Sequence, residues 1–336
     1  MQAAIYGIEG LELNEDERSF LCDADPAGMI IFRRNCEDAE QLLRLTDSLR
    51  ELTGRRDLPI LIDQEGGRVA RMRPPAWPAF PAAERFARLY QAAPSSAIEA
   101  VRSNARALAL MLRACGINVN CLPLLDVRQE GASDIIGDRA LGSEPMQVAA
   151  LGRAVLDGMA SAGVVGVVKH MPGHGRALVD SHKELPVVTA SADELEIDLE
   201  PFERLAWAPM GMTAHVVYTA WDAERPASLS PTVIQDIIRH RIGFDGWLMS
   251  DDLGMEALAG DFASRAAGVV AAGCDVALHC SGKMEEMVAV ASAVPPMSPE
   301  SHDRLTRAMA AVMVEDDDGP DLAEALAKRD TLLALV

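Results

Sequence analysis

The chain has 336 residues and a formal net charge of −20. Such an acidic protein is not expected to bind nucleic acid or an anionic membrane, because both partners require a basic patch, and a small neutral or cationic substrate fits it better. No run of apolar residues reaches the roughly 18 of a membrane span. The N-terminus does not resemble a signal peptide, so we expect a cytoplasmic protein. The six cysteines include no Cys-x-x-Cys pair, which predicts free thiols in a reducing compartment.

Apolar runs and amphipathic helical patterns alternate along the chain. We expect buried strands to begin near Ala3, Met29, Ile60, Ile117, Val164, Met210, Trp247 and Val276. Helical stripes of apolar residues lie between them, within 42–52, 98–115 and 148–159. Ser230, followed by a proline, is a typical helix N-cap, and the expected helix ends coincide with Gly116, Gly163, Gly243 and Gly273.

This alternation predicts an α/β fold, a single (β/α)8 TIM-type barrel with extra C-terminal helices. The strands are too apolar for one-sided exposure, and the count of about eight strand–helix units favours a closed barrel over an open sheet. We expect residues 1–336 to form one catalytic domain. The tail after about residue 299 is expected to be helical and packed on the barrel, with the acidic run Glu315–Asp318 as a solvated turn.

Three of the expected strands end in clusters of polar residues. They lie in residues 59–71, 164–186 and 246–255, and the second cluster combines a lysine, three histidines and an aspartate. The carboxyl ends of parallel strands meet at one edge of the fold, where the sites of such proteins are found. The sequence therefore predicts one site that draws on all three clusters.

The clusters also resemble a known family. Ile-Asp-Gln-Glu-Gly-Gly-Arg-Val (62–69), Ile-Gly-Asp-Arg-Ala-Leu-Gly (136–142), Lys-His-Met-Pro-Gly-His-Gly (169–175) with Asp-Ser-His (180–182), and Ser-Asp-Asp-Leu-Gly-Met (250–255) occur in this order. Together they resemble the NagZ-type β-N-acetylglucosaminidases of glycoside hydrolase family 3. Met171, Arg176 and Gly254 depart from the usual pattern without removing a group that the chemistry needs.

The resemblance implies a retaining exo-β-N-acetylglucosaminidase, a β-N-acetylhexosaminidase of peptidoglycan recycling in the cytoplasm. Its substrate would be a carbohydrate of the GlcNAc-anhydroMurNAc-peptide type, and no cofactor or metal is implied. By the same resemblance, Asp251 is the nucleophile, His182 the acid/base and Asp180 the residue that orients His182. The implied sugar-binding residues are Asp63, Arg71, Arg139, Lys169 and His170.

These assignments are chemically reasonable. Retention requires a carboxylate to attack the anomeric carbon and an acid to protonate the leaving oxygen. A histidine titrates near neutral pH, and a neighbouring carboxylate such as Asp180 fixes its tautomer. Strand alternation allows only one of Asp251 and Asp252 to point inward. The cations of the site are expected to pair with Asp63 or Glu65 when no sugar is bound.

Other readings of the same residues stay open. The nearest is phosphorolysis of the same β-N-acetylglucosaminides, because a neutral histidine tolerates incoming phosphate better than an anionic glutamate does. A metal-dependent barrel hydrolase is a second alternative, although Pro172 and Gly173 prevent a helix that would align His170 with His174 as metal ligands. A Schiff-base enzyme using Lys169 and a non-catalytic sugar-binding module are further alternatives. The roles of His174 and Asp252 and the aglycone preference are open, and we expect a monomer.

Overall fold

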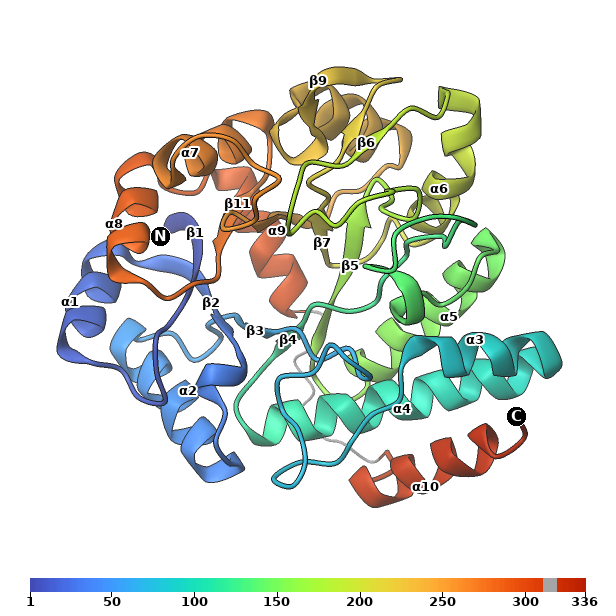
Figure 1. The fold of residues 1–336 in the computed structure, drawn as a ribbon. Helices are drawn as coiled ribbons and strands as arrows, with labels where there is room; N and C mark the ends of the chain where they lie inside the picture. The colour runs from blue at the N-terminus through green and yellow to red at the C-terminus, as the bar shows by residue number, and fades with distance from the viewer. Residues whose placement is uncertain (311–318) are drawn as a thin grey trace.

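The computed structural model describes residues 1–310 and 319–336, and it confirms the predicted (β/α)8 barrel (Figure 1). Eight parallel strands pair in chain order around a ring, and the last pairs with the first. The barrel strands are β1 (Gln2–Gly7), β2 (Pro26–Ile31), β3 (Ile60–Ile62), β4 (Val119–Asn120), β5 (Val165–Met171), β7 (Met210–Thr213), β10 (Trp247–Asp252) and β11 (Val276–His279). Each starts within a few residues of its expected position.

Helices surround the barrel. They are α1 (Glu15–Ala24), α2 (Ala39–Thr53), α3 (Ala83–Ala92), α4 (Pro94–Ala114), α5 (Pro145–Ala160), α6 (Ala192–Arg204), the π-helix η4 (Val233–Arg241), α7 (Phe262–Ala272) and α8 (Met284–Ala293), with short 3-10 turns η1 (Arg33–Asn35), η2 (Gly137–Arg139) and η3 (Ala227–Leu229). The expected N-cap is present, because Ser230 Oγ accepts a hydrogen bond from the Val233 amide. None of the helices in the described ranges is long and apolar enough to cross a bilayer.

Strand alternation divides the apolar residues into two cores. Leu61 of β3 points into the barrel, whereas its neighbours Ile60 and Ile62 point out to the helix layer. Both faces of the strands are therefore covered, as the continuous apolar runs predict.

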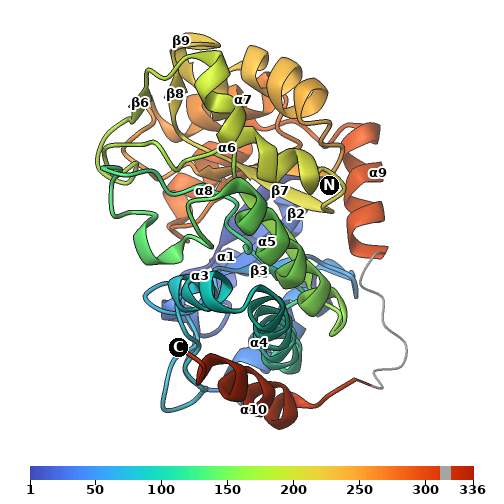
Figure 2. The same ribbon diagram turned by 90° about the vertical axis from the view of Figure 1, so that its right-hand side faces the viewer.

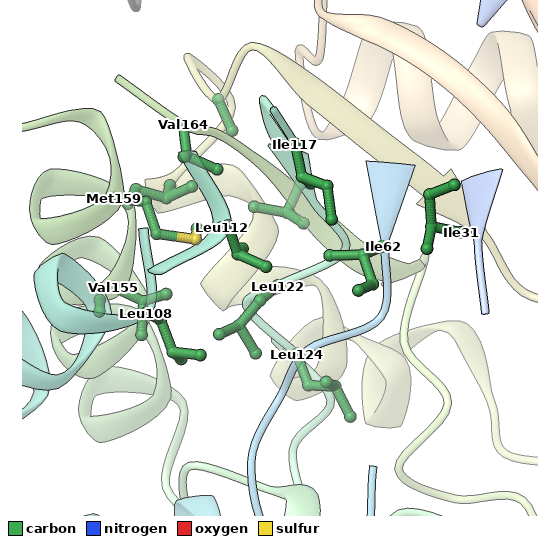
Figure 3. Close-up of a cluster of buried hydrophobic side chains, with 14 of the residues drawn as sticks. Ile31, Ile62, Leu108, Leu112, Ile117, Leu122, Leu124, Val155, Met159 and Val164 are labelled. Atoms are coloured by element: carbon green, nitrogen blue, oxygen red, sulfur yellow. The ribbon is translucent and has the colours of Figure 1, made fainter. Parts of the chain in front are cut away.

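Figure 3 shows part of the outer core, between the strands and two long helices. Leu108 and Leu112 of α4 and Val155 and Met159 of α5 gather on the side of the barrel where Ile62 ends β3. Burial of such large apolar side chains contributes about 1.5–3 kcal/mol each, so this layer fixes the strands that carry the polar clusters.

The C-terminal tail is helical, as expected. α9 (Pro299–Ala310) packs at the amino-terminal end of the barrel, where Leu305, Ala308 and Met309 join the interior core. α10 (Leu322–Leu333) lies along α4 (Figures 1 and 2). The acidic run Glu315–Asp318 lies outside the described residues.

A small accessory sheet was not predicted. It contains β6 (Val187–Val188), β8 (Val217–Tyr218) and β9 (Asp222–Pro226). Two strands of two residues and one largely exposed strand carry no periodic apolar pattern, so a single sequence gives little sign of them. The sheet matters because β6 follows the loop that begins after β5 and thereby holds the far end of that loop.

Candidate active site

Alternation along the strands places three charged residues at the carboxyl end of the barrel interior. In β10, Trp247 and Met249 point into the barrel, and Asp251, two residues further on, lines the pocket at the carboxyl end. The same count places Asp63 after the inward Leu61 of β3. Lys169 follows two inward valines of β5 and is only 2% exposed. The apolar interior therefore ends in a charged layer.

Seven of the eight predicted site residues line one pocket at this end of the barrel. They are Asp63, Arg71, Arg139, Lys169, His170, His182 and Asp251. The eighth, Asp180, is hydrogen-bonded to His182. The three polar clusters and the η2 turn therefore do meet around one cavity.

The cations of the pocket pair with its carboxylates, as the sequence predicts. Lys169 Nζ lies 3.0 Å from Asp63 Oδ1 and 2.8 Å from Glu65 Oε1. Arg139 donates two hydrogen bonds of 2.8 Å to Glu65, and Arg71 lies 3.3 Å from Asp63. Glu65 therefore holds two of the cations.

The pKa values of this cluster favour the charged forms. Burial alone raises the pKa of Asp63 and of Glu65, but the adjacent Lys169 outweighs it and keeps both below their ordinary values. For Lys169, burial lowers the pKa, and the two carboxylates more than reverse this. The cluster is thus ionised at neutral pH and presents fixed charges to a ligand.

Asp251 and Asp252 differ in their surroundings. Burial raises the pKa of Asp251, but the nearby His170 and His215 and a hydrogen bond from the Asp252 amide bring it below its ordinary value. The carboxylate of Asp252 instead accepts hydrogen bonds of 3.1 Å from the Gly254 and Cys280 amides, and burial raises its pKa. Asp252 therefore organises the ends of two strands, and Asp251 is the member of the pair whose surroundings favour the anion.

A buried carboxylate that the sequence analysis missed supports His170. Asp126 Oδ2 lies 2.8 Å from His170 Nδ1, and Asp126 Oδ1 accepts hydrogen bonds from the backbone amides of His170 and His174. Burial raises the pKa of Asp126, but His170 and these hydrogen bonds bring it down to about 2. A signal was available, because Asp126 directly follows the apolar pair Leu124 and Leu125 in the segment after β4.

Asp180 and His182 form a pair in the loop after β5. Asp180 Oδ1 lies 2.9 Å from His182 Nδ1 and accepts a 2.9 Å hydrogen bond from the His182 amide. The His182 side chain is 61% exposed and borders the pocket. The pKa of Asp180 is lowered, because its hydrogen bonds from His182 outweigh the effect of burial. An ionised Asp180 thus contacts Nδ1 of an accessible imidazole and orients the ring.

Two further residues border this arrangement. Nε2 of His215 lies 3.1 Å from the Asp252 carbonyl oxygen, and its Nδ1 lies 2.7 Å from Ser228 Oγ. The guanidinium of Arg71 stacks on the Phe32 ring, with its central carbon 4.9 Å from the ring centroid. Within the described residues, no three His, Cys, Asp or Glu side chains are grouped to hold a metal ion.

Known proteins with this arrangement identify the family. A sequence model of the glycosyl hydrolase family 3 N terminal domain matches residues 3–313. A Beta-hexosaminidase of Alkalilimnicola ehrlichii is 41% identical over 308 residues, which cover 90% of this chain and 87% of the relative. Native NagZ from Neisseria gonorrhoeae is 34% identical, with a TM-score of 0.87 and coverage of 99% of this chain and 98% of that chain.

The same fold has been solved with a sugar derivative. NagZ from Neisseria gonorrhoeae in complex with N-trifluoroacetyl-D-glucosamine is 33% identical to this chain, with a TM-score of 0.86 and coverage of 99% and 98%. The family match spans most of the chain, and the relatives are covered almost in full. The chain therefore belongs to glycosyl hydrolase family 3 and is a NagZ-like β-N-acetylhexosaminidase.

Proposed function

We propose that this enzyme is a retaining exo-β-N-acetylglucosaminidase that removes terminal N-acetylglucosamine from peptidoglycan-derived muropeptides of the GlcNAc-anhydroMurNAc-peptide type. The likeness to NagZ and the N-acetylglucosamine derivative in a NagZ complex support this substrate class. We further propose that residues 1–336 act as one catalytic domain, as a monomer in the cytoplasm and without a cofactor or metal.

In the proposed first step, Asp251 attacks the anomeric carbon of the bound sugar. The bond to the leaving oxygen breaks as His182 gives that oxygen a proton, and a glycosyl–Asp251 ester forms. Because Asp180 engages Nδ1 of His182, the proton comes from Nε2. The low pKa of Asp251 supports this role, since the nucleophile must be ionised when the substrate binds.

In the second step, His182 acts as the base. It removes a proton from a water molecule, which attacks the anomeric carbon and releases Asp251 as a carboxylate and the sugar as its β anomer. A histidine suits both steps because its ordinary pKa of about 6.5 lies close to neutral pH. Asp180 keeps the imidazole in one orientation through both steps and stabilises its protonated form.

The charged cluster is proposed to hold the non-reducing sugar. Asp63 accepts hydrogen bonds from hydroxyl groups, and Arg71, Arg139, Lys169 and His170 donate to hydroxyls or to the acetamido carbonyl. The ion pairs of these side chains keep them in place, which reduces the entropy lost on binding. The contact of His170 with Asp126 does the same for its ring.

The observation that carries the proposal is that an ionised aspartate and an oriented histidine border the same pocket. The test is the dependence of His182→Ala on the leaving group. Cleavage of a GlcNAc-anhydroMurNAc disaccharide should slow by about 10²–10⁴-fold, the usual contribution of a general acid. The pre-steady-state release of nitrophenolate, which leaves without a proton and precedes hydrolysis of the intermediate, should slow much less. Equal losses on both substrates would assign His182 to sugar binding.

Phosphorolysis is distinguished by the product. The proposal predicts free β-N-acetylglucosamine as the first sugar detected by NMR, at equal rates in phosphate and in a non-phosphate buffer. A sugar 1-phosphate, or turnover that requires phosphate, would instead support the phosphorolytic reading.

A further inference from the structure

The loop that carries Asp180 and His182 is held firmly at its start. Tyr218, which is buried, donates a 2.7 Å hydrogen bond from its hydroxyl to the Gly173 carbonyl oxygen. Arg176 pairs with the buried Asp198 at 2.6 Å, and the Ala177 carbonyl oxygen accepts a hydrogen bond from the Ser133 amide. The loop is therefore fixed as far as Ala177.

The loop is also held at its end. The Pro186 carbonyl oxygen accepts a 2.9 Å hydrogen bond from the Val217 amide, and β6, which follows directly, pairs with β8. The part between these two anchors is residues 178–185. Leu178, at one end of this part, is 70% exposed. Residues 182–184 are also exposed.

Ser181 is the single buried residue of 178–185, with 3% of it exposed. It stands between Asp180 and His182 in the sequence. Its Oγ lies 3.2 Å from Nε2 of His174, which is buried in the pocket wall and whose backbone amide is tied to Asp126. One side-chain contact therefore links the segment that bears the acid/base to the rigid carboxyl end of β5.

The His174 ring can hydrogen-bond to Ser181 without carrying a charge. Burial and the nearby His170 lower the pKa of His174 to about 4, so its ring is uncharged at neutral pH. No described residue hydrogen-bonds to its Nδ1. The Ser181 hydroxyl is therefore the hydrogen-bond partner of this ring among the described residues.

We propose that the His174–Ser181 hydrogen bond is a catch that seats Asp180 and His182 at the pocket, which makes His174 and Ser181 positioning residues. The inference rests on the proposed role of His182 as acid/base. A neutral hydrogen bond shifts an equilibrium by about three- to tenfold. The catch therefore favours the seated loop and still opens readily when substrate enters or product leaves.

The test compares Ser181→Ala with the wild-type full-length enzyme by two measurements. Amide hydrogen exchange should become about three- to tenfold faster in residues 178–185 and stay unchanged in the rest of the barrel. The value of kcat/KM should fall by a similar factor for the GlcNAc-anhydroMurNAc disaccharide. KM for a nitrophenyl N-acetylglucosaminide should stay the same, because the sugar-binding cluster is untouched.

Leu178→Ala serves as the control, and two further variants test the contact from the His174 side. Leu178→Ala changes an exposed side chain of the same segment and should behave as wild type in both measurements. His174→Phe keeps the backbone and a ring but removes Nε2, so it should reproduce the faster exchange of Ser181→Ala. Combining the two should add nothing, because both remove the same contact. Additive effects, or wild-type exchange in Ser181→Ala, would overturn the catch.

The same assay separates this inference from the proposed function. If His182→Ala spares the nitrophenyl substrate and Ser181→Ala matches wild type on both substrates, the catch is wrong and the acid/base assignment stands. If His182→Ala loses both activities equally, that assignment fails. Hydrogen exchange in Ser181→Ala then still decides whether the contact holds the loop.

Discussion

Replacing Lys169 with methionine removes the cation that contacts both Asp63 and Glu65. The ammonium group is buried, and it lies 3.0 Å from one carboxylate and 2.8 Å from the other. Methionine has a similar length and no charge. The variant therefore leaves two largely buried carboxylates close together with less compensation.

The size of the effect follows from the contacts that stay. Removing one partner of a buried ion pair costs about 3–5 kcal/mol. Asp63 keeps Arg71 at 3.3 Å, and Glu65 keeps its two 2.8 Å hydrogen bonds from Arg139. We therefore expect Lys169→Met to lower the unfolding free energy at neutral pH by about 3 kcal/mol, the lower end of that range.

The loss should depend on pH in one direction. Despite burial, Lys169 holds the pKa values of Asp63 and Glu65 below their ordinary values, so its stabilisation is present at neutral pH and is lost as pH falls through the folded-state pKa values. Without Lys169 both pKa values rise and the carboxyls take up protons at higher pH. The difference in unfolding free energy between variant and wild type should therefore be largest at neutral pH and shrink as pH falls below about 4, the ordinary pKa range of these carboxyls.

Denaturant unfolding at several pH values measures this difference. Lys283→Met is the matched control, because Lys283 is 68% exposed and its salt bridge, to Glu286, is expected to contribute only about 0–1 kcal/mol. A loss below about 1 kcal/mol for Lys169→Met, or one that is equal at both ends of the pH range, would refute the argument.

Two other predictions concern specificity and the support of His170. Aryl β-N-acetylglucosaminides should exceed aryl β-glucosides in kcat/KM by at least about tenfold, because a site built to hydrogen-bond a group rejects analogues without it; equal values would contradict an acetamido site. Asp126→Asn should lower unfolding free energy by about 2 kcal/mol above pH 4, since the pKa of Asp126 falls from 3.8 to about 2. This difference should narrow as pH approaches 2, and denaturant curves with a constant difference would exclude an ionised Asp126 as the cause.

The barrel strands were predictable because burial on both faces requires continuous apolar runs, and the eight runs expected to be strands each mark a strand of the barrel. The polar clusters at the strand ends were visible for the same reason, since Asp63, Lys169 and Asp251 interrupt or end apolar runs. The resemblance to a known family supplied the chemical roles that it implies for these residues. Local pattern therefore located the pocket.

Contacts between distant segments were not predictable. Asp126 and His170 are 44 residues apart, and nothing in either segment names the other as its partner. The cations were expected to pair with Asp63 or Glu65, but which cation contacts which carboxylate depends on how β5 and the loops that carry Glu65 and Arg139 meet in the folded barrel. The contact of Ser181 with His174 depends on how the loop folds back over β5.

The central claim is that Asp251 becomes covalently linked to the sugar, and mass spectrometry tests it most directly. His182→Ala should react with a nitrophenyl N-acetylglucosaminide and then hydrolyse the intermediate slowly, because the base is missing. In the acid-quenched reaction, the peptide that contains residue 251 should gain the mass of one N-acetylglucosamine unit, and fragmentation should place it on Asp251. A burst of nitrophenol without this adduct, or an adduct on Asp252 or elsewhere, would contradict the account.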